Sequence, residues 1–378
     1  MAKKEIDNIR LGLLKKFGSN AIIMGADHEK AQYGRISTGS INLDLKLGGG
    51  IPIGRMTQIS GAKSTAKSTL CDHIIKNAQT TKVEWVWTER KEVKGRELVE
   101  EHPRKVDGLI CAYLDVEGTK TIEWTRDTIG VDTDNWLYAQ PSGLEECLEM
   151  AHQMQKDGVH LIVIDSIDSL EPTKEYESQM GESVQMGLKP KMIGEYCRKY
   201  TATNNMLVRR GDLPCTVILI NQLREKIGAY GDIEYTPGGR AIEFYTSVDI
   251  RLRRGDWIVE GTGENKEIVG QVIKFKTHKN KTYKQQQSGE FDFYFVDTPI
   301  AKAGEIDTFK EVVVAGINYG VIERAGSWFK YRGKNIAQGA DNTVIYLRKN
   351  PEVFKQVKDE LFSIVEREAN AMSEGSED

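Results

Sequence analysis

The 378-residue chain lacks several features that would place it in a specialised class. It has no apolar run of about 18 residues, the length that crosses a membrane. Its first residues, MAKKEIDNIRLGLLKKFG, lack the apolar core of a signal peptide. Its five cysteines form no C-x-x-C pair, which disfavours zinc and indicates reduced thiols. We therefore expect a cytoplasmic protein without membrane contact.

A large net charge is also absent. The net charge is −4, which taken alone argues against a polyanionic partner. The charge is unevenly distributed, however. Five lysines and no acid lie between Gln271 and Gln285, and the last nine residues hold three acids and no base. Because local fields decide polyanion binding, the total charge does not exclude nucleic acid.

The stretch GAKSTAKST at residues 61–69 lacks one glycine of a phosphate-binding loop. Gly61, Lys67 and Ser68 match the pattern G-x-x-x-x-G-K-[ST], but Ala66 replaces the second glycine. In such loops backbone N–H groups bind phosphates, the lysine reaches them, and the serine hydroxyl ligates Mg²⁺. We expect nucleotide binding by Gly61, Ala62, Lys63, Ser64, Thr65, Ala66, Lys67, Ser68 and Thr69. The alternative is a turn of small residues without a ligand.

The surroundings of this loop favour an α/β fold. Short apolar segments alternate with helical patterns along the chain. Strands are expected at 56–60, 109–114, 160–164 and 216–220, and helices at 69–79 and 144–156. This alternation predicts a parallel sheet covered on both faces. Ligands bind such sheets at the carboxyl ends of the strands.

Three polar side chains follow three of these strands. Asp165 is placed to hold Mg²⁺ with Ser68, or alternatively to cap the next helix. Glu117 can polarise the water that attacks the γ-phosphate, or be a surface or ion-paired residue of a tight turn. Gln222 can sense the γ-phosphate, or be an amide that satisfies nearby backbone. Their convergence on one sheet edge supports an ATP site more strongly than any single motif.

Changes in composition divide the chain into parts. Residues 1–34 contain an amphipathic helix, with Ile6, Ile9, Leu13 and Leu14 on one side, and a linker. Residues 82–107 hold seven bases and seven acids, which predicts a surface insertion, either a solvated hairpin or a partner surface. We expect the main domain to span residues 35–299, and residues 300–378 to form a small C-terminal α/β domain with a short acidic tail.

The order of these signatures resembles the RecA family of homologous-recombination ATPases over about residues 18–365. The stretches that carry the resemblance are ISTGSINLDLKLGGGIPIGR, the phosphate loop, YLDVEGT, LIVIDSIDSLEPTKEYESQMGES, INQLREKIG, TPGGRAIEFYTSVDIRLRR and AGSWFKYRGKNIAQG. Ala66, Arg240 and the insertion at 82–107 depart from the bacterial pattern. Ala66 and the insertion suggest a bacteriophage-encoded or otherwise divergent member.

The resemblance implies a RecA-like P-loop ATPase core with a parallel or mixed sheet. Glu117 and Asp165 match the family's catalytic glutamate and Walker-B acid. Trp124 matches an aromatic residue stacked on adenine, with a core tryptophan as the alternative, and Gln222 matches the residue that couples ATP to DNA. Lys279 and Lys281 match lysines that reach the ATP of a neighbouring protomer. The catalytic roles are therefore expected at Lys67, Glu117, Gln222, Lys279 and Lys281.

The resemblance also implies two DNA-binding loops, at about residues 175–186 and 223–239. The expected DNA contacts are Met186, Gly187, Lys191, Arg198, Arg224, Lys226, Gly238 and Gly239. For an individual lysine or arginine the alternative is a solvated surface charge. Phe244 lies in a segment that contributes to the protomer interface, and the N-terminal helix and linker match the polymerisation element that docks on the next subunit.

The implied function is that of a DNA-dependent ATPase, with ATP and Mg²⁺ as cofactors, that forms a helical filament on single-stranded DNA. The filament would pair with homologous duplex DNA and exchange strands, and mediator or single-strand-binding proteins are further expected partners. Two alternatives remain open. One is a hexameric helicase or branch-migration motor with the same core, and the other is an ATP-binding DNA-binding protein with a weakened hydrolytic site.

Overall fold

The computed structural model describes residues 2–22, 33–173, 187–225, 234–235 and 240–374. Its main sheet has eight strands in the order β14-β13-β12-β3-β9-β8-β6-β7. The six strands from β12 to β7 run parallel to their neighbours, and β13 and β14 add an antiparallel edge. The bounds are Met56–Gly61 for β3, Cys111–Asp115 for β6, Trp136–Ala139 for β7, Leu161–Asp165 for β8, Thr216–Gln222 for β9, Val248–Glu260 for β12, Glu267–Asn280 for β13 and Ser288–Tyr294 for β14. The fold class is therefore α/β with a mixed sheet, as expected.

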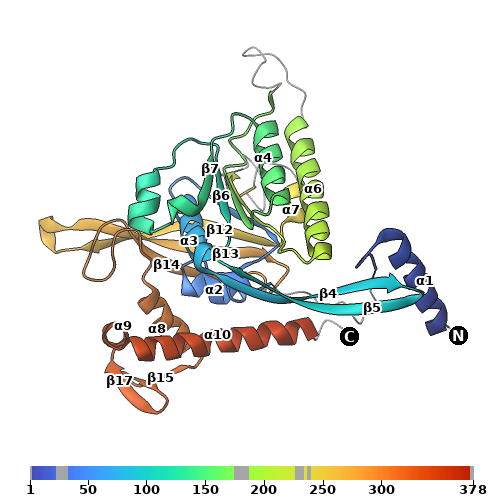
Figure 1. The fold of residues 1–378 in the computed structure, drawn as a ribbon. Helices are drawn as coiled ribbons and strands as arrows, with labels where there is room; N and C mark the ends of the chain where they lie inside the picture. The colour runs from blue at the N-terminus through green and yellow to red at the C-terminus, as the bar shows by residue number, and fades with distance from the viewer. Residues whose placement is uncertain (1, 23–32, 174–186, 226–233, 236–239, 375–378) are drawn as a thin grey trace.

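Both faces of the sheet are covered, and the central strands are buried at almost every position. In β8, Leu161 and Val163 pack in the core that includes α3 (Lys67–Thr80). Ile162 and Ile164, which point the other way, pack in the core that includes α4 (Leu144–Lys156) and α6 (Leu188–Arg210). The result is a three-layered domain (Figure 1) in which the six strands from β12 to β7 deliver their carboxyl ends to one edge.

Shorter elements connect these layers. They are α1 (Ala2–Phe17), β1 (Arg35–Ile36), α2 (Ile41–Leu47), β2 (Ile51–Pro52), the π-helix η2 (Trp124–Ile129), η3 (Thr133–Asn135), β10 (Arg224–Glu225), β11 (Glu234–Tyr235), α7 (Arg240–Tyr245) and η4 (Gly263–Asn265). The predicted DNA-binding residues Met186, Lys226, Gly238 and Gly239 lie outside the described residues, and for Arg224 only the backbone is described.

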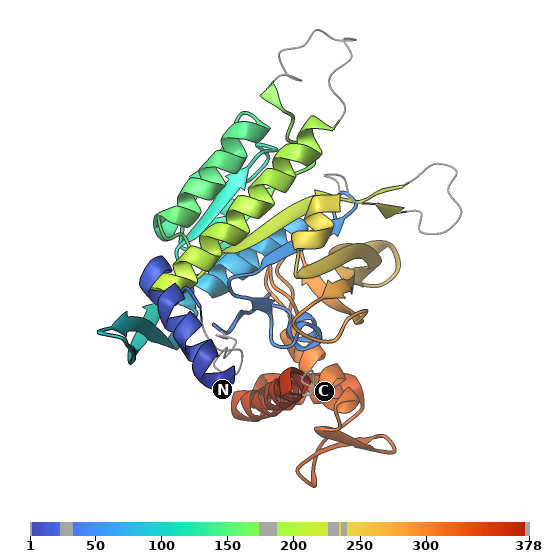
Figure 2. The ribbon, with the colours of Figure 1, turned by 90° about the vertical axis from the view of Figure 1, so that its right-hand side faces the viewer.

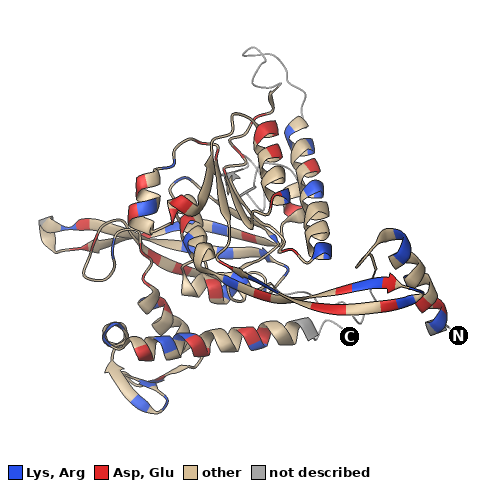
Figure 3. Cartoon of the chain, in the orientation of Figure 1, with Lys and Arg blue, Asp and Glu red and all other residues tan. Residues whose placement is uncertain are grey.

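The 82–107 segment forms a long antiparallel hairpin, with β4 at Lys82–Val93 and β5 at Arg96–Asp107. Its two-residue turn, Lys94-Gly95, has positive φ at both positions (51° and 79°), the geometry that matches the twist of a hairpin. Acidic and basic residues alternate along both strands (Figure 3). Near its base Val83 is buried, whereas the outer part extends from the core and carries α1 beside it (Figures 1 and 2).

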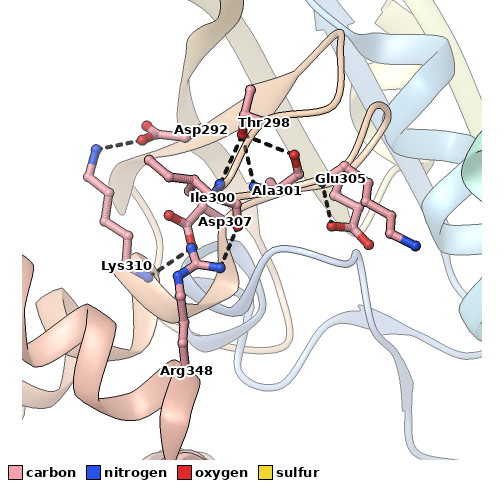
Figure 4. A network of polar contacts seen from close by, with 9 residues as sticks. Asp292, Thr298, Ile300, Ala301, Glu305, Asp307, Lys310 and Arg348 are labelled. Carbon is pink, nitrogen blue, oxygen red and sulfur yellow. Dashed lines mark hydrogen bonds and ion pairs between the residues drawn. The ribbon is translucent and has the colours of Figure 1, made fainter. Parts of the chain in front are cut away.

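The C-terminal segment packs three helices against a three-stranded meander. The elements are α8 (Thr308–Asn318), β15 (Ile322–Ala325), β16 (Trp328–Tyr331), β17 (Lys334–Gln338), α9 (Ala340–Lys349) and α10 (Pro351–Glu374). Polar contacts join it to the core (Figure 4): Arg348 donates to Asp307 at 2.6 Å and to the Ile300 carbonyl, and Lys310 bridges to Asp292 of β14 at 2.6 Å. Across the described part of the chain, no helix is both long and apolar enough to cross a bilayer.

Candidate nucleotide site and DNA-facing surfaces

The phosphate loop joins the end of β3 to the start of α3, so its backbone lies at the N-terminus of a helix. Lys67 Nζ donates to the carbonyl oxygens of Gly61 (3.0 Å) and Ala62 (2.8 Å), which holds the ammonium over the loop. Burial lowers the pKa of Lys67, while Asp165 and Glu117 act in the opposite direction. A partly desolvated cation above converging N–H groups suits an anionic phosphate.

The two glycine positions of the loop behave differently. A Cβ at Gly61 would lie 2.5 Å from Thr65 Oγ1 and 2.6 Å from the Leu252 carbonyl oxygen, so this position accepts no side chain. Ala66 has φ 58° and ψ 25°, in the left-handed region. For an L-residue this conformation costs roughly 1–2 kcal/mol. The loop therefore keeps this left-handed conformation with an alanine at residue 66, and the strain lowers the free energy of unfolding.

Ser68 and Asp165, the predicted metal ligands, lie together at the sheet edge. Ser68 Oγ donates to Asp165 Oδ2 at 2.6 Å, and Tyr113 of the neighbouring strand donates to the same oxygen at 2.5 Å. Burial raises the pKa of Asp165, and the hydrogen bonds from Ser68 and Tyr113 oppose that rise. A hydroxyl and a carboxylate side by side are hard oxygen donors of the kind Mg²⁺ prefers.

Glu117 follows β6 and faces the same edge. Its Oε1 accepts hydrogen bonds from Ser166 (2.7 Å), Ser169 (3.0 Å) and Gln222 Nε2 (3.2 Å). These neutral donors fix the orientation of the carboxylate. The three polar residues predicted to converge from separate strands, Glu117, Asp165 and Gln222, thus share one site, as the parallel-sheet rule implies.

A cleft of about 600 Å³ opens above these groups. The predicted residues among its lining are Lys63, Ser64, Thr65, Ala66, Lys67, Ser68, Thr69, Glu117, Trp124, Asp165 and Gln222. Trp124 lies in the π-helix η2 and is half-buried, so it both lines the cleft and packs on the core. Its position leaves one ring available for a flat ligand such as a nucleobase.

Two further groups were missed by the sequence analysis. The far wall of the cleft is aromatic: Trp257 of β12 meets Phe295 edge-on at 6.3 Å between ring centroids. The alternation Phe291, Phe293, Phe295 was a readable signal for this wall. The second group is Lys120, whose Nζ lies 4.0 Å from the Tyr113 ring centroid and forms a buried ion pair with Asp72. It supports Asp165 through Tyr113.

Lys279 and Lys281 lie elsewhere. Their Nζ atoms donate to the carbonyl oxygens of Glu243 and Phe244 in α7. Lys279 stands opposite Asp249, near the start of β12, whereas the phosphate loop follows the carboxyl end of the adjacent strand. Neither lysine lines the cleft of its own chain, so a nucleotide contact would require another copy.

The described DNA-facing candidates lie on α6. Gly187 precedes this helix with φ 97°, and Lys191 and Arg198 are both exposed. Seven residues separate them, about two helical turns, so they share one side of α6. This arrangement suits two phosphates along one strand, and a solvated-charge interpretation of either residue alone stays open.

A basic ladder on the β12–β13 ribbon was also missed. Arg251 stands opposite Lys276, and Arg253 opposite Lys274. Like charges directly opposite one another destabilise a strand pair, although Arg251 also lies 3.7 Å from Asp249 and Lys274 stands opposite Glu290 of β14. Sequence patterning could not reveal it, because the register between the two strands sets which residues meet.

A strand–loop–helix phosphate site with acids at the ends of other parallel strands of the same sheet is the arrangement of a P-loop ATPase. Comparisons with known proteins make this specific. The family model of the RecA N-terminal domain matches residues 4–90 and 98–298, and that of the RecA C-terminal domain matches residues 310–365. The unmatched residues 91–97 include the tip of the β4–β5 hairpin.

Curated relatives match along nearly the whole chain. The chain is 34% identical over 352 residues to "Protein RecA" of Cutibacterium acnes (92% of this chain and 88% of that protein). It is 33% identical over 378 residues to "Protein RecA" of Frankia casuarinae (98% and 96%) and 32% identical over 382 residues to that of Campylobacter hominis (100% and 96%). The chain therefore belongs to the RecA family, and it is a nucleotide-binding, DNA-dependent ATPase of recombination and repair.

Proposed function

We propose that the chain uses ATP bound in this cleft to control a helical filament on single-stranded DNA, which pairs with homologous duplex DNA and exchanges strands. One observation carries the proposal. Gln222, at the root of the second predicted DNA loop, donates directly to Glu117, the carboxylate predicted to act on the attacking water. This hydrogen bond of 3.2 Å thus connects Gln222, the residue expected to respond to DNA, with Glu117, the residue expected to act on ATP.

The chemistry assigned to each residue follows from its neighbours. Lys67 and the loop N–H groups bind the phosphates, and Glu117 orients the water and accepts its proton. Ser68 and Asp165 would hold Mg²⁺, which when bound neutralises charge on the phosphates. Trp124 and Phe295 would enclose the base. The decayed-site alternative finds no support here, because the lysine, both oxygen ligands and the carboxylate line one cleft.

DNA would be held through its phosphates, without reading bases. Lys191 and Arg198 on α6 would contact the first strand, together with Arg224 and the two loops. The basic ladder of β12 and β13 would hold the homologous duplex, because its four bases (Arg251, Arg253, Lys274 and Lys276) lie on a separate ribbon. Mediator or single-strand-binding proteins would act on the assembled filament.

Assembly would occur between a helix and a cleft of different copies. A cleft of about 510 Å³ at the amino end of β6 and β7 carries exposed Ile110 and Leu137 beside Asp107, Asp132 and Asp134. The helix α1 exposes Ile6, Ile9 and Phe17 and ends in Lys15 and Lys16. These surfaces are complementary but not alike, and such heterologous contacts generate open helices when the rotation does not close.

The lysine pair fits the same arrangement. Lys279 and Lys281 sit beside Phe244, which is 67% exposed. A large apolar side chain at the surface next to two cations suits an interface, and in the filament it would bring both lysines to the neighbour's phosphates.

The proposal is tested by Gln222→Ala, with Gln140→Ala as the matched control. Gln140 is another amide at this sheet edge, and it donates to Tyr138. We expect Gln222→Ala to bind ATP normally but to lose most DNA stimulation of turnover, measured as phosphate release with and without single-stranded DNA. Normal stimulation in Gln222→Ala would reject the coupling role. Absence of stimulation in the wild-type chain would reject the proposed function.

A further inference from the structure

The β4–β5 hairpin makes specific contacts with the N-terminal segment of the chain. Arg10 of α1 bonds Glu97 of β5, and the two side chains are 13% and 16% exposed. Asn20 follows the helix and binds the free edge of β4 three times: its amide donates to the Thr88 carbonyl, and its backbone N–H and side-chain oxygen pair with Arg90. A bare strand edge is thereby covered.

These contacts use one side of α1 and leave another side open. Arg10 and Leu14 are four residues apart and lie on the side toward the hairpin, where Leu14 is 2% exposed. Ile6, Ile9 and Phe17 lie on an adjacent side and are 46%, 60% and 56% exposed. The hairpin contact therefore leaves the apolar stripe of α1 (Ile6, Ile9 and Phe17) available.

The hairpin also fixes how far α1 stands from its own core. Ten residues of β5 separate Glu97 from Asp107, which corresponds to roughly 33 Å at the rise of a strand. Asp107 lines the acidic cleft at the base of the hairpin. Figure 1 shows α1 beside the outer part of β4 and β5, away from the base of the hairpin. The C-terminal end of α1 is held in addition by Arg209 of α6, which donates to the Phe17 carbonyl at 3.0 Å.

We infer that the 82–107 hairpin is a brace that fixes the pose of α1 and presents its apolar stripe to a second copy of this chain. This inference rests on the proposed filament function, and it adds a determinant of assembly that is supplied by the hairpin. The opposite arrangement is a clamp, in which the hairpin withholds α1 and has to release it before assembly. A brace and a clamp predict opposite changes in filament assembly when the Arg10–Glu97 contact is broken, and again when it is cross-linked.

Charge reversal distinguishes them. Glu97→Arg and Arg10→Glu should each raise the protein concentration needed for filaments on single-stranded DNA by roughly tenfold, because each replaces the ion pair by two like charges in a largely buried contact. The double variant, Arg10→Glu with Glu97→Arg, should recover part of this loss, since the pair is re-formed with reversed polarity. Recovery is partial because Asp7 and Arg90 then carry the same charge as the reversed residue beside each of them. Glu101→Arg makes the same charge change at an exposed residue of β5 and should assemble normally.

A cross-link between residues 10 and 97 provides a second test of the brace. Arg10→Cys with Glu97→Cys, joined by a short bis-maleimide, should still form filaments, because a brace stays closed. The five native cysteines are all buried, so labelling is directed to the new pair. Stronger assembly of the single reversals, failure of the double variant to recover, or loss of filaments on cross-linking would each overturn the brace.

The failure of the inference is separable from failure of the proposed function. Ile9→Asp places a charge in the exposed stripe without touching the hairpin contact, and it should abolish filaments while monomers still bind ATP. If Ile9→Asp assembles normally, assembly through α1 is wrong, whatever the hairpin does. If Ile9→Asp fails to assemble while Glu97→Arg matches the wild type, the brace alone is rejected. ATP binding and thermal unfolding of each variant report whether it is folded.

Discussion

Asp165 and Glu311 are both buried carboxylates whose pKa is raised, yet their surroundings give them different uses. Asp165 is 8% exposed at the ATP cleft, where hydroxyls of Ser68 and Tyr113 bond it and Lys67 and Lys120 lie nearby. Glu311 of α8 is 5% exposed at the contact between the C-terminal segment and α2. It accepts from Ser40 Oγ (2.5 Å) and from the Ile41 N–H (2.8 Å).

The difference lies in the neighbouring groups. Burial and the charge of Glu117 raise the pKa of Asp165, while hydrogen bonds from Ser68 and Tyr113 and the charge of Lys120 favour its charged form. Glu311 has neutral donors as its bonded partners and the acid Asp44 as a neighbour, and burial raises its pKa to about 8. Burial therefore leaves Asp165 as a carboxylate that would bind Mg²⁺, and it leaves Glu311 as a protonated acid that links α8 to α2.

The largest effect is expected from a change of Asp165, the buried carboxylate at the nucleotide cleft. Asp165→Asn keeps the size of the side chain and an acceptor for Ser68 but removes the charge. We expect turnover to fall roughly hundredfold or more, because metal-derived charge stabilisation is worth several kcal/mol. The stability to urea should be unchanged or higher, since a buried charge is removed.

The matched control is Asp44→Asn, which neutralises another buried carboxylate, one whose pKa is raised to about 6 but which lies outside the cleft. Its turnover should equal that of the wild type. Comparable losses in both variants, measured as DNA-stimulated phosphate release, would mean that buried charge in general, and not the ligand at residue 165, determines activity.

A smaller effect on stability is expected from the titration of Glu311, the buried carboxylate outside the cleft. The pKa of Glu311 rises from 4.5 to about 8 on folding, so the folded chain holds a proton that the unfolded chain releases. The stabilisation is complete below pH 4.5 and is lost as the pH rises toward 8. Between pH 6 and 8, wild-type stability should therefore fall with a contribution of up to about 1.4 kcal/mol per pH unit from this group.

Glu311→Gln removes this titration while keeping an amide that can bond Ser40 and Ile41. The free energy of unfolding, measured in urea at several pH values, should lose most of its slope between pH 6 and 8. Asp44, with a pKa of about 6, titrates lower and adds to the slope mainly below that window. A slope equal to the wild type's would show that Glu311 is charged in the folded chain.

Sequence reasoning brought together the polar residues of the candidate nucleotide site because its rule is topological. Parallel strands end at one edge, so Glu117, Asp165 and Gln222 could be brought together on paper from apolar runs alone. The groups that it missed depend on register or on long-range packing. Trp257 of β12 meets Phe295, which follows β14, and Arg10 meets Glu97 across 87 residues of sequence. The alternation of phenylalanines indicates an aromatic face, but no local pattern encodes which distant residue such a side chain meets. The roles of Lys279 and Lys281 stay predictions for the assembled protein.

The smallest effect concerns backbone strain at the same edge that holds Asp165. Ala66 already has left-handed φ and ψ in this structure, so its strain of roughly 1–2 kcal/mol burdens folding and not nucleotide binding. Ala66→Gly removes the strain but makes the unfolded chain more flexible, by roughly 0.5–1 kcal/mol. The net gain in the free energy of unfolding should be about 0.5–1 kcal/mol, with ATP affinity changed less than about twofold.

Urea unfolding and calorimetric titration with ATP measure the two quantities on the same sample. Ala62→Gly is the control, because Ala62 has no left-handed backbone and glycine there should lower stability. A large gain in ATP affinity for Ala66→Gly would instead mean that the loop reaches its working conformation only when nucleotide binds, and the strain would then belong to binding.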